Sequence, residues 1–312
     1  MNILVTGGCG FIGSHIVDQL IRENHEVTII DDLTTGTLKY LNPKADFYKL
    51  NIRSENIRDI FEKKKFHIVF HMAAQIDAAR SIKEAHLDAD INIMGTINIL
   101  ENMKNFGVSK IIFPSSAAIY GNIQSLPIKE NGSTVPVSFY GLSKLTAENY
   151  IIAYSDHWGL DYTIFRYSNV FGLRQGAKGE CGVVKIFWDN VLKGQDATIF
   201  GEGIQTRDFI YILDVVSANM EAIYKGSKAI INISTGNPVT INQLFKTMQS
   251  ILNSSISVNY KQERPGDIKE SYLCNENAFE ILNWKPKYGL QEGIEHMYNE
   301  YGNAIVKLYN MI

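Results

Sequence analysis

The most informative stretch of this 312-residue chain is Val5-Thr6-Gly7-Gly8-Cys9-Gly10-Phe11-Ile12-Gly13. It begins within a short apolar run at residues 2–6 and leads into a helical pattern at residues 11–23. The glycines at positions 7, 10 and 13 let the backbone turn tightly and approach a bound pyrophosphate. The helix behind them presents free N–H groups and the positive end of its dipole. The stretch therefore predicts a strand, a phosphate-binding turn and a helix.

The second predicted strand, residues 26–31, ends on a carboxylate. Asp31 lies 18 residues beyond Gly13, close to the spacing expected for a dinucleotide-binding fold. A carboxylate there accepts hydrogen bonds from the adenosine ribose and repels a 2′-phosphate. The spacing therefore favours NAD over NADP as the cofactor.

Further buried strands are predicted from His67, Lys110 and Asp161, and they alternate with long helical patterns at residues 84–106 and 138–158. Apolar runs that alternate with helices indicate parallel strands with helices on both faces. The fold class predicted is α/β, with a Rossmann-type doubly wound parallel sheet.

After about residue 170 the pattern breaks into glycine-rich loops, a helix at 183–193 and short strands. This part predicts a smaller C-terminal α/β lobe that binds the substrate. We expect an NAD-binding domain at residues 1–170, joined by returning segments near 205–235. Residues 171–312 should form mainly the substrate-binding lobe.

Composition excludes several classes of protein. The net charge is only −3, from 30 basic and 33 acidic side chains. The sequence has no long basic run, so we expect no nucleic-acid partner. Cys9, Cys181 and Cys274 lie far apart, which predicts neither a metal site nor a disulfide framework and suits a reducing compartment. No apolar stretch approaches about 18 residues, so we expect a cytoplasmic protein without a membrane partner.

Three side chains predict a proton-transfer site. Tyr140 and Lys144 are four residues apart at the start of a helical pattern and share one face. Ser116 ends a buried strand, where doubly wound sheets bind ligands. A free tyrosine has a pKa of about 10, so a base near pH 7 needs a shift worth about 4 kcal/mol. A nearby ammonium supplies part of it by favouring the phenolate.

Eight motifs together resemble the extended short-chain dehydrogenases over nearly the whole chain, most closely the UDP-glucose (UDP-galactose) 4-epimerases. They are TGGCGFIG from Thr6, DDLTTG from Asp31, HMAAQ from His71, SSAAIYG from Ser115, YGLSK from Tyr140, RYSNVFG from Arg166, RDFIY from Arg207 and RPGD from Arg264.

The resemblance implies that Tyr140 removes the proton of the sugar 4-hydroxyl while hydride passes from C4 to NAD. Ser116 positions the oxygen, and Lys144 holds the nicotinamide ribose and lowers the pKa of the tyrosine. The implied cofactor contacts are Gly7, Gly10, Phe11, Ile12, Asp31, Asp32, Thr34, Gly36, Asn51, Ile52, Ala73, Ala74, Gln75, Asn92, Tyr140, Lys144 and Tyr167. Asn51 departs from the usual aspartate, although its amide oxygen can still accept a bond from the adenine amino group.

For the substrate, a UDP-sugar, the resemblance points to Ser116, Asn169, Val184, Phe200, Arg207, Arg264 and Asp267. The residue four places after Asp267 is Ser271. In the resembling epimerases a tyrosine there goes with plain hexoses and a small residue leaves room for an N-acetyl group. The family also commonly forms homodimers through two helices per subunit, here 84–106 and 138–158. Ile91, Met94, Ile97 and Leu145 would serve that seam or the core of the monomer.

The sequence also bears on three rival functions. Nucleotide-sugar 4,6-dehydratases carry an Asp-Glu pair after the active-site hydroxyl residue, and Ala117 and Ala118 stand there instead. An epimerase or decarboxylase acting on UDP-glucuronate remains compatible with the sequence. A non-catalytic NAD-sensing regulator is disfavoured, because a sensor needs no proton shuttle.

Overall fold

The computed structural model describes residues 1–123, 125–176, 182–264 and 268–309, with side chains as far as residue 302. Its centre is a seven-stranded sheet in which every pairing is parallel. In spatial order the strands are β10 (Ala229–Ile233), β6 (Asp161–Tyr167), β5 (Lys110–Ser116), β4 (Ile68–His71), β1 (Asn2–Thr6), β2 (Glu26–Asp31) and β3 (Asp46–Lys49). The predicted Rossmann-type sheet is confirmed.

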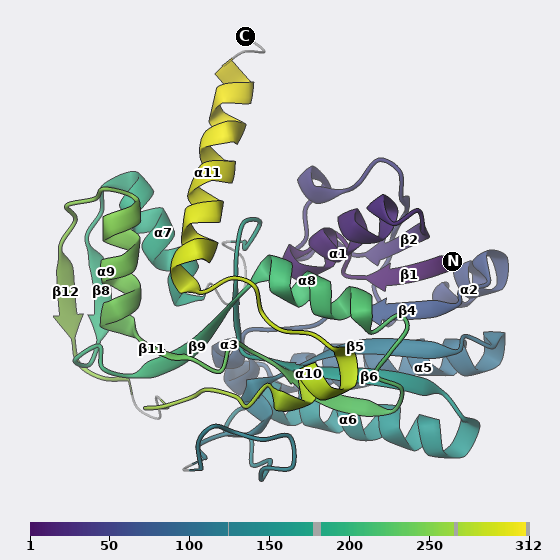
Figure 1. Cartoon of the computed structure of the whole chain (residues 1–312). Helices are drawn as coiled ribbons and strands as arrows, with labels where there is room; N and C mark the ends of the chain where they lie inside the picture. The colour runs from purple at the N-terminus through teal and green to yellow at the C-terminus, as the bar shows by residue number, and fades with distance from the viewer. Residues whose placement is uncertain (124, 177–181, 265–267, 310–312) are drawn as a thin grey trace.

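Helices cover both faces of this sheet (Figure 1). On one face lie α1 (Phe11–Arg22) and α8 (Ile212–Glu221), which pack on each other. On the other lie α2 (Ile57–Lys64), α5 (Gly95–Phe106) and α6 (Phe139–Trp158). Each layer has its own apolar core, because the buried strands alternate their side chains between the two faces. The strand order reverses between β1 and β4, which opens a crevice at the carboxyl ends of these strands.

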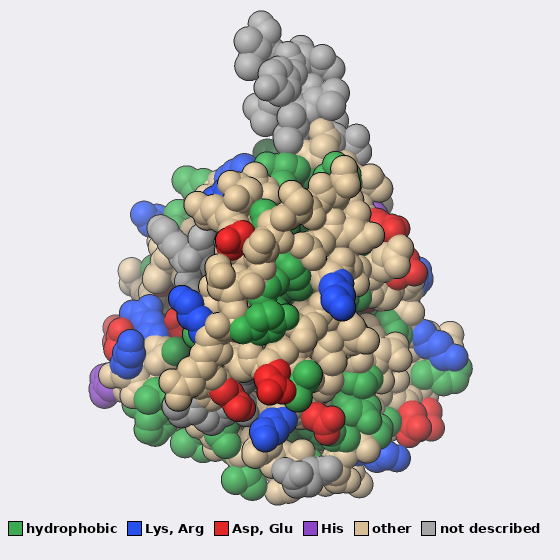
Figure 2. Space-filling view, turned by 90° about the vertical axis from the view of Figure 1, so that its left-hand side faces the viewer, with side chains coloured by type: hydrophobic (Ala, Val, Ile, Leu, Met, Phe, Trp, Pro, Cys, Tyr) green, Lys and Arg blue, Asp and Glu red, His purple; other side chains and the backbone are tan. Residues whose placement is uncertain are grey.

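A smaller part of the molecule stands beside the sheet. It contains a three-stranded sheet, β11 (Pro238–Thr240), β9 (Thr206–Tyr211) and β7 (Asn169–Phe171), and a two-stranded sheet, β12 (Val258–Lys261) and β8 (Ala197–Phe200). Around them lie α7 (Val183–Lys193), α9 (Ile241–Ile251) and α11 (Leu290–Tyr309), while α10 (Glu276–Leu282) packs on β10. On this side of the molecule acidic and basic side chains are interspersed (Figure 2).

The predicted helix at residues 84–106 is interrupted. The chain forms α3 (Ala78–Lys83), α4 (Ala85–Ala89), a π-helical turn at Asp90–Met94 and then α5. The extra residue of a π-turn rotates the helix beyond it, and such turns are frequent at functional sites. Here the turn carries the buried side chain of Asn92 toward the crevice, where it bonds the backbone of Gln75. None of the described helices combines the length and apolarity needed to cross a membrane.

Two short 3-10 turns complete the described elements, at Leu38–Tyr40 and at Ala117–Ile119. The second comes directly after β5. The Ser116 hydroxyl caps this turn by accepting from the N–H of Ala118 at 3.2 Å. This cap fixes the direction in which Ser116 leaves the sheet.

Candidate active site

The glycine turn brings β1, α1 and β4 together. Gly7 has φ +67°, and a Cβ built on it would lie 2.7 Å from the backbone N of Ala73. A Cβ on Gly13 would collide with the carbonyl oxygen of Gly7. Only glycine fits both positions, because the first needs a left-handed backbone and the second a close helix–strand contact. No side chain caps the N-terminus of α1, which therefore faces the crevice with its backbone N–H groups.

A pocket of about 360 Å³ lies in this crevice. Twelve of the predicted cofactor residues line it: Gly7, Gly10, Phe11, Ile12, Asp31, Asp32, Thr34, Asn51, Ile52, Ala73, Ala74 and Gln75. The glycine cradle, the uncapped helix and the acidic strand end fit the pyrophosphate and ribose of NAD. Gly36, Asn92, Tyr140, Lys144 and Tyr167 stand outside the pocket lining.

Asp31 is held rigidly at the end of β2. One carboxylate oxygen accepts from the N–H of Cys9 at 2.9 Å and the other from the N–H of Leu33 at 2.8 Å. Burial raises the pKa of Asp31, and the two N–H donors oppose that rise. Each oxygen keeps a second lone pair for a ribose hydroxyl. Gly36 lies against the same carboxylate, since a Cβ there would approach Asp31 Oδ1 to 2.9 Å.

Asn51 is engaged in a way that the sequence did not indicate. Its amide nitrogen donates to Asp32 Oδ2 at 2.6 Å. Its amide oxygen accepts both from the backbone N–H of Arg53 at 3.0 Å and from Arg53 Nε at 2.8 Å. The oxygen expected to receive the adenine amino group is therefore already occupied by Arg53 in this structure.

The three predicted proton-transfer residues lie on two neighbouring elements. Ser116 ends β5, and Tyr140 and Lys144 lie in the first turns of α6, which packs on β5. Tyr140 is half-buried, and its backbone N–H donates to Ser81 Oγ at 3.0 Å. The Lys144 ammonium lies 4.1 Å from the centroid of the Phe113 ring, which belongs to β5.

Lys144 is buried, with 3% of its surface exposed. Burial lowers its pKa to about 7, and the carboxylates of Glu148 and Asp88 oppose that fall. A neighbouring phenolate would stabilise the ammonium, just as the ammonium would stabilise the phenolate.

A chain of hydrogen bonds lies beneath this site. His71 bonds Thr6 Oγ1 at 2.8 Å and Thr96 Oγ1 at 3.1 Å. Thr96 in turn donates to the carbonyl of Asn92 at 2.7 Å. Burial, and after it the charge of Lys144, lowers the pKa of His71 to about 3. The imidazole is therefore neutral near pH 7 and ties β1 and β4 to the π-turn.

Two of the predicted site residues, Tyr167 and Val184, are buried. The Tyr167 ring is buried in the apolar core, and its hydroxyl accepts from Asn219 Nδ2 at 2.7 Å. Val184, near the start of α7, is buried with 2% of its surface exposed. The side chains of these two residues do not line either described pocket.

A second cavity, of about 660 Å³, lies beside the smaller sheets. Its described lining is Asn122, Ile123, Leu126, Phe200, Gly201, Glu202, Ile204, Gln205, Glu263, Ile268, Lys269 and Glu270. The Arg264 guanidinium lies 3.9 Å from the centroid of the Phe200 ring. That face of the ring is therefore covered by a cation. Arg207 donates from Nη1 to the carbonyl of Ile268 at 2.6 Å, which ties β9 to the edge of this cavity.

The remaining substrate candidates lie on different segments. Asn169 is exposed at the start of β7, and Ser271 is half-buried next to Tyr272. Asp267, with the Pro265 and Gly266 of the RPGD motif, lies outside the described residues.

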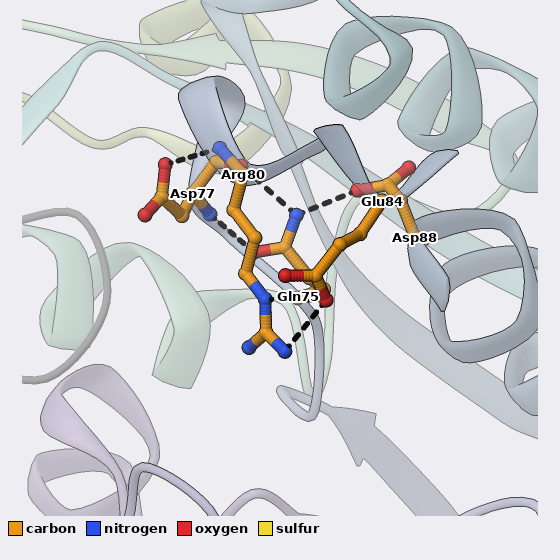
Figure 3. A network of polar contacts seen from close by, with 5 residues as sticks. All are labelled: Gln75, Asp77, Arg80, Glu84 and Asp88. Carbon is orange, nitrogen blue, oxygen red and sulfur yellow. Dashed lines mark hydrogen bonds and ion pairs between the residues drawn. The ribbon is translucent and has the colours of Figure 1, made fainter. Parts of the chain in front are cut away.

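Sequence reasoning missed a group of residues around α3 and α4. Asp77 and Arg80 line the cofactor pocket, and Asp88 is buried behind it. Figure 3 shows these side chains converging with Gln75 and Glu84. Asp77 caps α3 by accepting from the N–H of Arg80 at 2.9 Å. The signal available was the HMAAQ motif, whose continuation into 76–88 carries the extra groups.

Comparisons with known proteins agree with this geometry. The model of the NAD dependent epimerase/dehydratase family matches residues 3–234. The chain is similar to a Thermotoga maritima UDP-glucose 4-epimerase solved with UDP-glucose, at 42% identity and a TM-score of 0.95, covering 98% of this chain and 100% of that one. It is similar to a Thermus thermophilus UDP-glucose 4-epimerase solved with NAD, at 34% identity and a TM-score of 0.92, covering 97% and 100%.

A third solved relative is the UDP-N-acetylglucosamine 4-epimerase of Methanobrevibacter ruminantium, in complex with UDP-N-acetylmuramic acid. It is 35% identical, with a TM-score of 0.90, and the match covers 96% of this chain and 98% of that one. The predicted resemblance and the NAD cofactor are confirmed. The chain belongs to the NAD-dependent epimerase/dehydratase family, among its UDP-sugar 4-epimerases.

Proposed function

We propose that the protein inverts C4 of a UDP-hexose through a transient 4-keto sugar, with Tyr140 as the base. The observation that carries this proposal is the buried Lys144, one helical turn from Tyr140 and beside the strand that ends in Ser116. A buried ammonium in that position can stabilise a developing anion.

Each residue has a defined task in this proposal. Tyr140 takes the proton of the 4-hydroxyl and returns it after the sugar has turned. Lys144 supplies the positive charge that favours the phenolate. Ser116 accepts a bond from Ala118, which leaves its own hydroxyl proton to hold the sugar 4-oxygen. Bound NAD supplies a reversible hydride acceptor.

Substrate binding is assigned to the second cavity and its surroundings. Arg207 and Arg264 offer the fork-shaped donors that suit a diphosphate. Phe200 can stack on uracil after the Arg264 guanidinium turns from the ring toward a phosphate. We further propose that residues 171–312 contribute most of these contacts, and that residues 1–170 with the returning segments near 205–235 hold the cofactor.

The direct test is conversion of UDP-glucose to UDP-galactose by purified protein without added NAD. Interconversion is expected, because hydride returns to the same molecule and the cofactor is regenerated in each cycle. A panel with UDP-GlcNAc, UDP-glucuronate and their C4 epimers, read by product analysis, defines the substrate class. Turnover of UDP-glucuronate alone would replace the proposal with the uronate alternative.

Ser271 is proposed to admit an N-acetyl group at the sugar's second carbon. The segment beside it is fixed, because the carbonyl of Tyr272 accepts from the N–H of Ile128 at 3.0 Å and Leu273 is buried. We therefore expect turnover of UDP-GlcNAc as well as UDP-glucose. Ser271→Tyr should reduce kcat/KM for the N-acetylated substrate at least about tenfold, since steric exclusion is a strong determinant of specificity.

The matched control for this variant is UDP-glucose itself, whose kcat/KM should change little. Equal handling of both substrates by Ser271→Tyr would contradict the pocket assignment, as would a parent enzyme that ignores UDP-GlcNAc.

We also propose a homodimer formed through α5 and α6. Ile91 and Leu145 pack against the cores of the monomer, whereas Met94 and Leu142 expose 55% and 48% of their surfaces. Met94 ends the π-turn that leads into α5, and Leu142 lies on α6. Exposed large apolar side chains in these positions suit a helix-bundle contact. Multi-angle light scattering at micromolar concentration should give twice the chain mass, and Met94→Glu/Leu142→Glu should give the mass of one chain. A monomeric parent protein would refute the dimer.

A further inference from the structure

Asp88 is a buried carboxylate that the proposed mechanism does not yet use. It lies on α4 with 1% of its surface exposed. Its Oδ1 accepts from Gln75 Nε2 at 2.8 Å and from Asn92 Nδ2 at 3.3 Å. Its Oδ2 is buried and has no hydrogen-bonding partner within the described ranges. Both amide donors bond the same oxygen, so the other oxygen of this buried carboxylate relies on a nearby cation for stabilisation.

The partners of Asp88 connect it to both halves of the site. Gln75, seen in Figure 3 with its amide directed at Asp88, lines the cofactor pocket. Asn92 bonds the backbone of Gln75 in both directions, through Oδ1 at 2.9 Å and Nδ2 at 2.9 Å. Asn92 Nδ2 also donates to Ser143 Oγ at 3.0 Å, and Ser143 directly precedes Lys144 on α6. A displacement of Asp88 would therefore also displace Gln75 in the pocket wall and Ser143 on α6.

Lys144 is the cation that Asp88 can balance, because α4 packs against α6. Glu148 lies one turn further along α6, and its charge raises the pKa of Lys144 more than the charge of Asp88 does. Its charge is already matched, however. Arg166 donates to both Glu148 oxygens, at 3.2 Å and 2.7 Å, and both side chains are buried. Asp88 has no such cation bonded to it among the described residues. Its negative charge is therefore less neutralised by other groups than that of Glu148, and more of it acts on Lys144.

The other charged groups around this part of α6 do not replace Asp88. On β4, His71 is neutral near pH 7. On α3, Arg80 is paired with Glu84 at 2.9 Å and Lys83 is exposed. The β5 contact is the apolar Phe113 ring.

Charged groups on the π-turn and on α5 are likewise paired elsewhere. On the π-turn, Asp90 is paired with Arg53. On α5, Glu101 bonds Lys104 and also Tyr154, which lies ten residues farther along α6 than Lys144.

We propose that Asp88 is a positioning residue of the proton-transfer site, whose buried carboxylate keeps Lys144 in its ammonium form and anchors Gln75 and Asn92. The proposal rests on the function proposed above for Lys144. With Asp88 neutralised, Lys144 gives up its proton more easily, and the Tyr140 phenolate loses the cation that stabilises it. Proton transfer then slows while the sugar nucleotide still binds.

The first test reads the charge of Lys144 without using turnover. The protein is loaded with NAD, carries 13C at its lysine ε-carbons and is titrated by NMR; the signal that vanishes in Lys144→Arg identifies Lys144. Asp88→Asn keeps an oxygen for Gln75 and Asn92 and removes only the charge. We expect the pKa of Lys144 to fall by about one unit in Asp88→Asn. The matched control Glu84→Gln, an exposed carboxylate of the same network, should leave it unchanged.

The second test is kinetic and uses a UDP-hexose that the parent enzyme turns over. Asp88→Asn should lower kcat about tenfold with KM changed less than about twofold, and should move the alkaline limb of the kcat–pH profile to lower pH by about one unit. An unchanged pKa of Lys144 would overturn the proposal. So would an unmoved pH profile, even with reduced kcat, since a purely structural role predicts that outcome. If the parent enzyme epimerises no UDP-sugar, the proposed function fails and the NMR titration alone decides the role of Asp88.

Discussion

Tyr140→Phe is expected to lower kcat by about 10²–10⁴-fold while the protein retains its NAD. The substitution removes only the phenolic oxygen. The backbone contacts of residue 140, to Ser81 and Ser143, remain in place. A loss of this size corresponds to about 3–5 kcal/mol of transition-state stabilisation. Turnover of UDP-glucose, with NAD quantified after denaturation of the same sample, measures both quantities.

Tyr150→Phe is the matched control, because Tyr150 lies on the same helix and exposes 40% of its surface. It should behave as the parent enzyme does. Near-normal turnover in Tyr140→Phe with full NAD content would refute the tyrosine base, whereas loss of NAD from that variant would assign Tyr140 to cofactor retention.

Arg166→Met is expected to reduce the free energy of unfolding by about 3–5 kcal/mol. The substitution leaves the carboxylate of Glu148, whose side chain is 1% exposed, buried without its cation. It also removes the Nη1 bonds to the Tyr120 hydroxyl at 3.0 Å and to the carbonyl of Glu130 at 2.8 Å. Urea denaturation at constant protein and NAD concentration gives the measurement.

The control is the double variant Glu148→Leu/Arg166→Met, which replaces both charges with apolar side chains. A buried ion pair contributes little net stability once desolvation is counted, so the double variant should be more stable than Arg166→Met. Equal or greater destabilisation of the double variant would show that the pair has a favourable net energy in this core.

The sequence was sufficient for those features that depend on local chemistry. The glycine turn, the acid at the end of β2 and the alternation of strands and helices each involve residues close together in the chain. Their geometry is dictated by backbone sterics and by apolar periodicity, both of which a single sequence displays. The pocket lined by Gly7, Asp31 and Gln75 could therefore be predicted before its shape was known.

Features that depend on burial or on distant segments could not be predicted in this way. Asp88 is one of several acids in a helical pattern, and only tertiary packing distinguishes it from the exposed Glu84. The π-turn at Asp90–Met94 adds one residue without breaking the apolar pattern. Asp208, in the RDFIY motif, is a further example, because its partners are distant in the chain. Its carboxylate accepts from the backbone N–H groups of Thr235 and Gly236, at 2.9 Å each.

The return of the chain to the main sheet has a consequence for how the protein can be divided. β10 is one of the two edge strands of the seven and pairs with β6 from Ala229 to Ile233. In the chain it comes after β9, a strand of the smaller three-stranded sheet. A fragment that stopped at residue 170 would leave the hydrogen-bonding edge of β6 bare and α1 without its neighbour α8. An uncovered strand edge is a template for pairing with other chains, so such a fragment would tend to aggregate. The main sheet and the smaller part of the molecule are thus interlaced in one chain path and cannot be exchanged between relatives by a single cut.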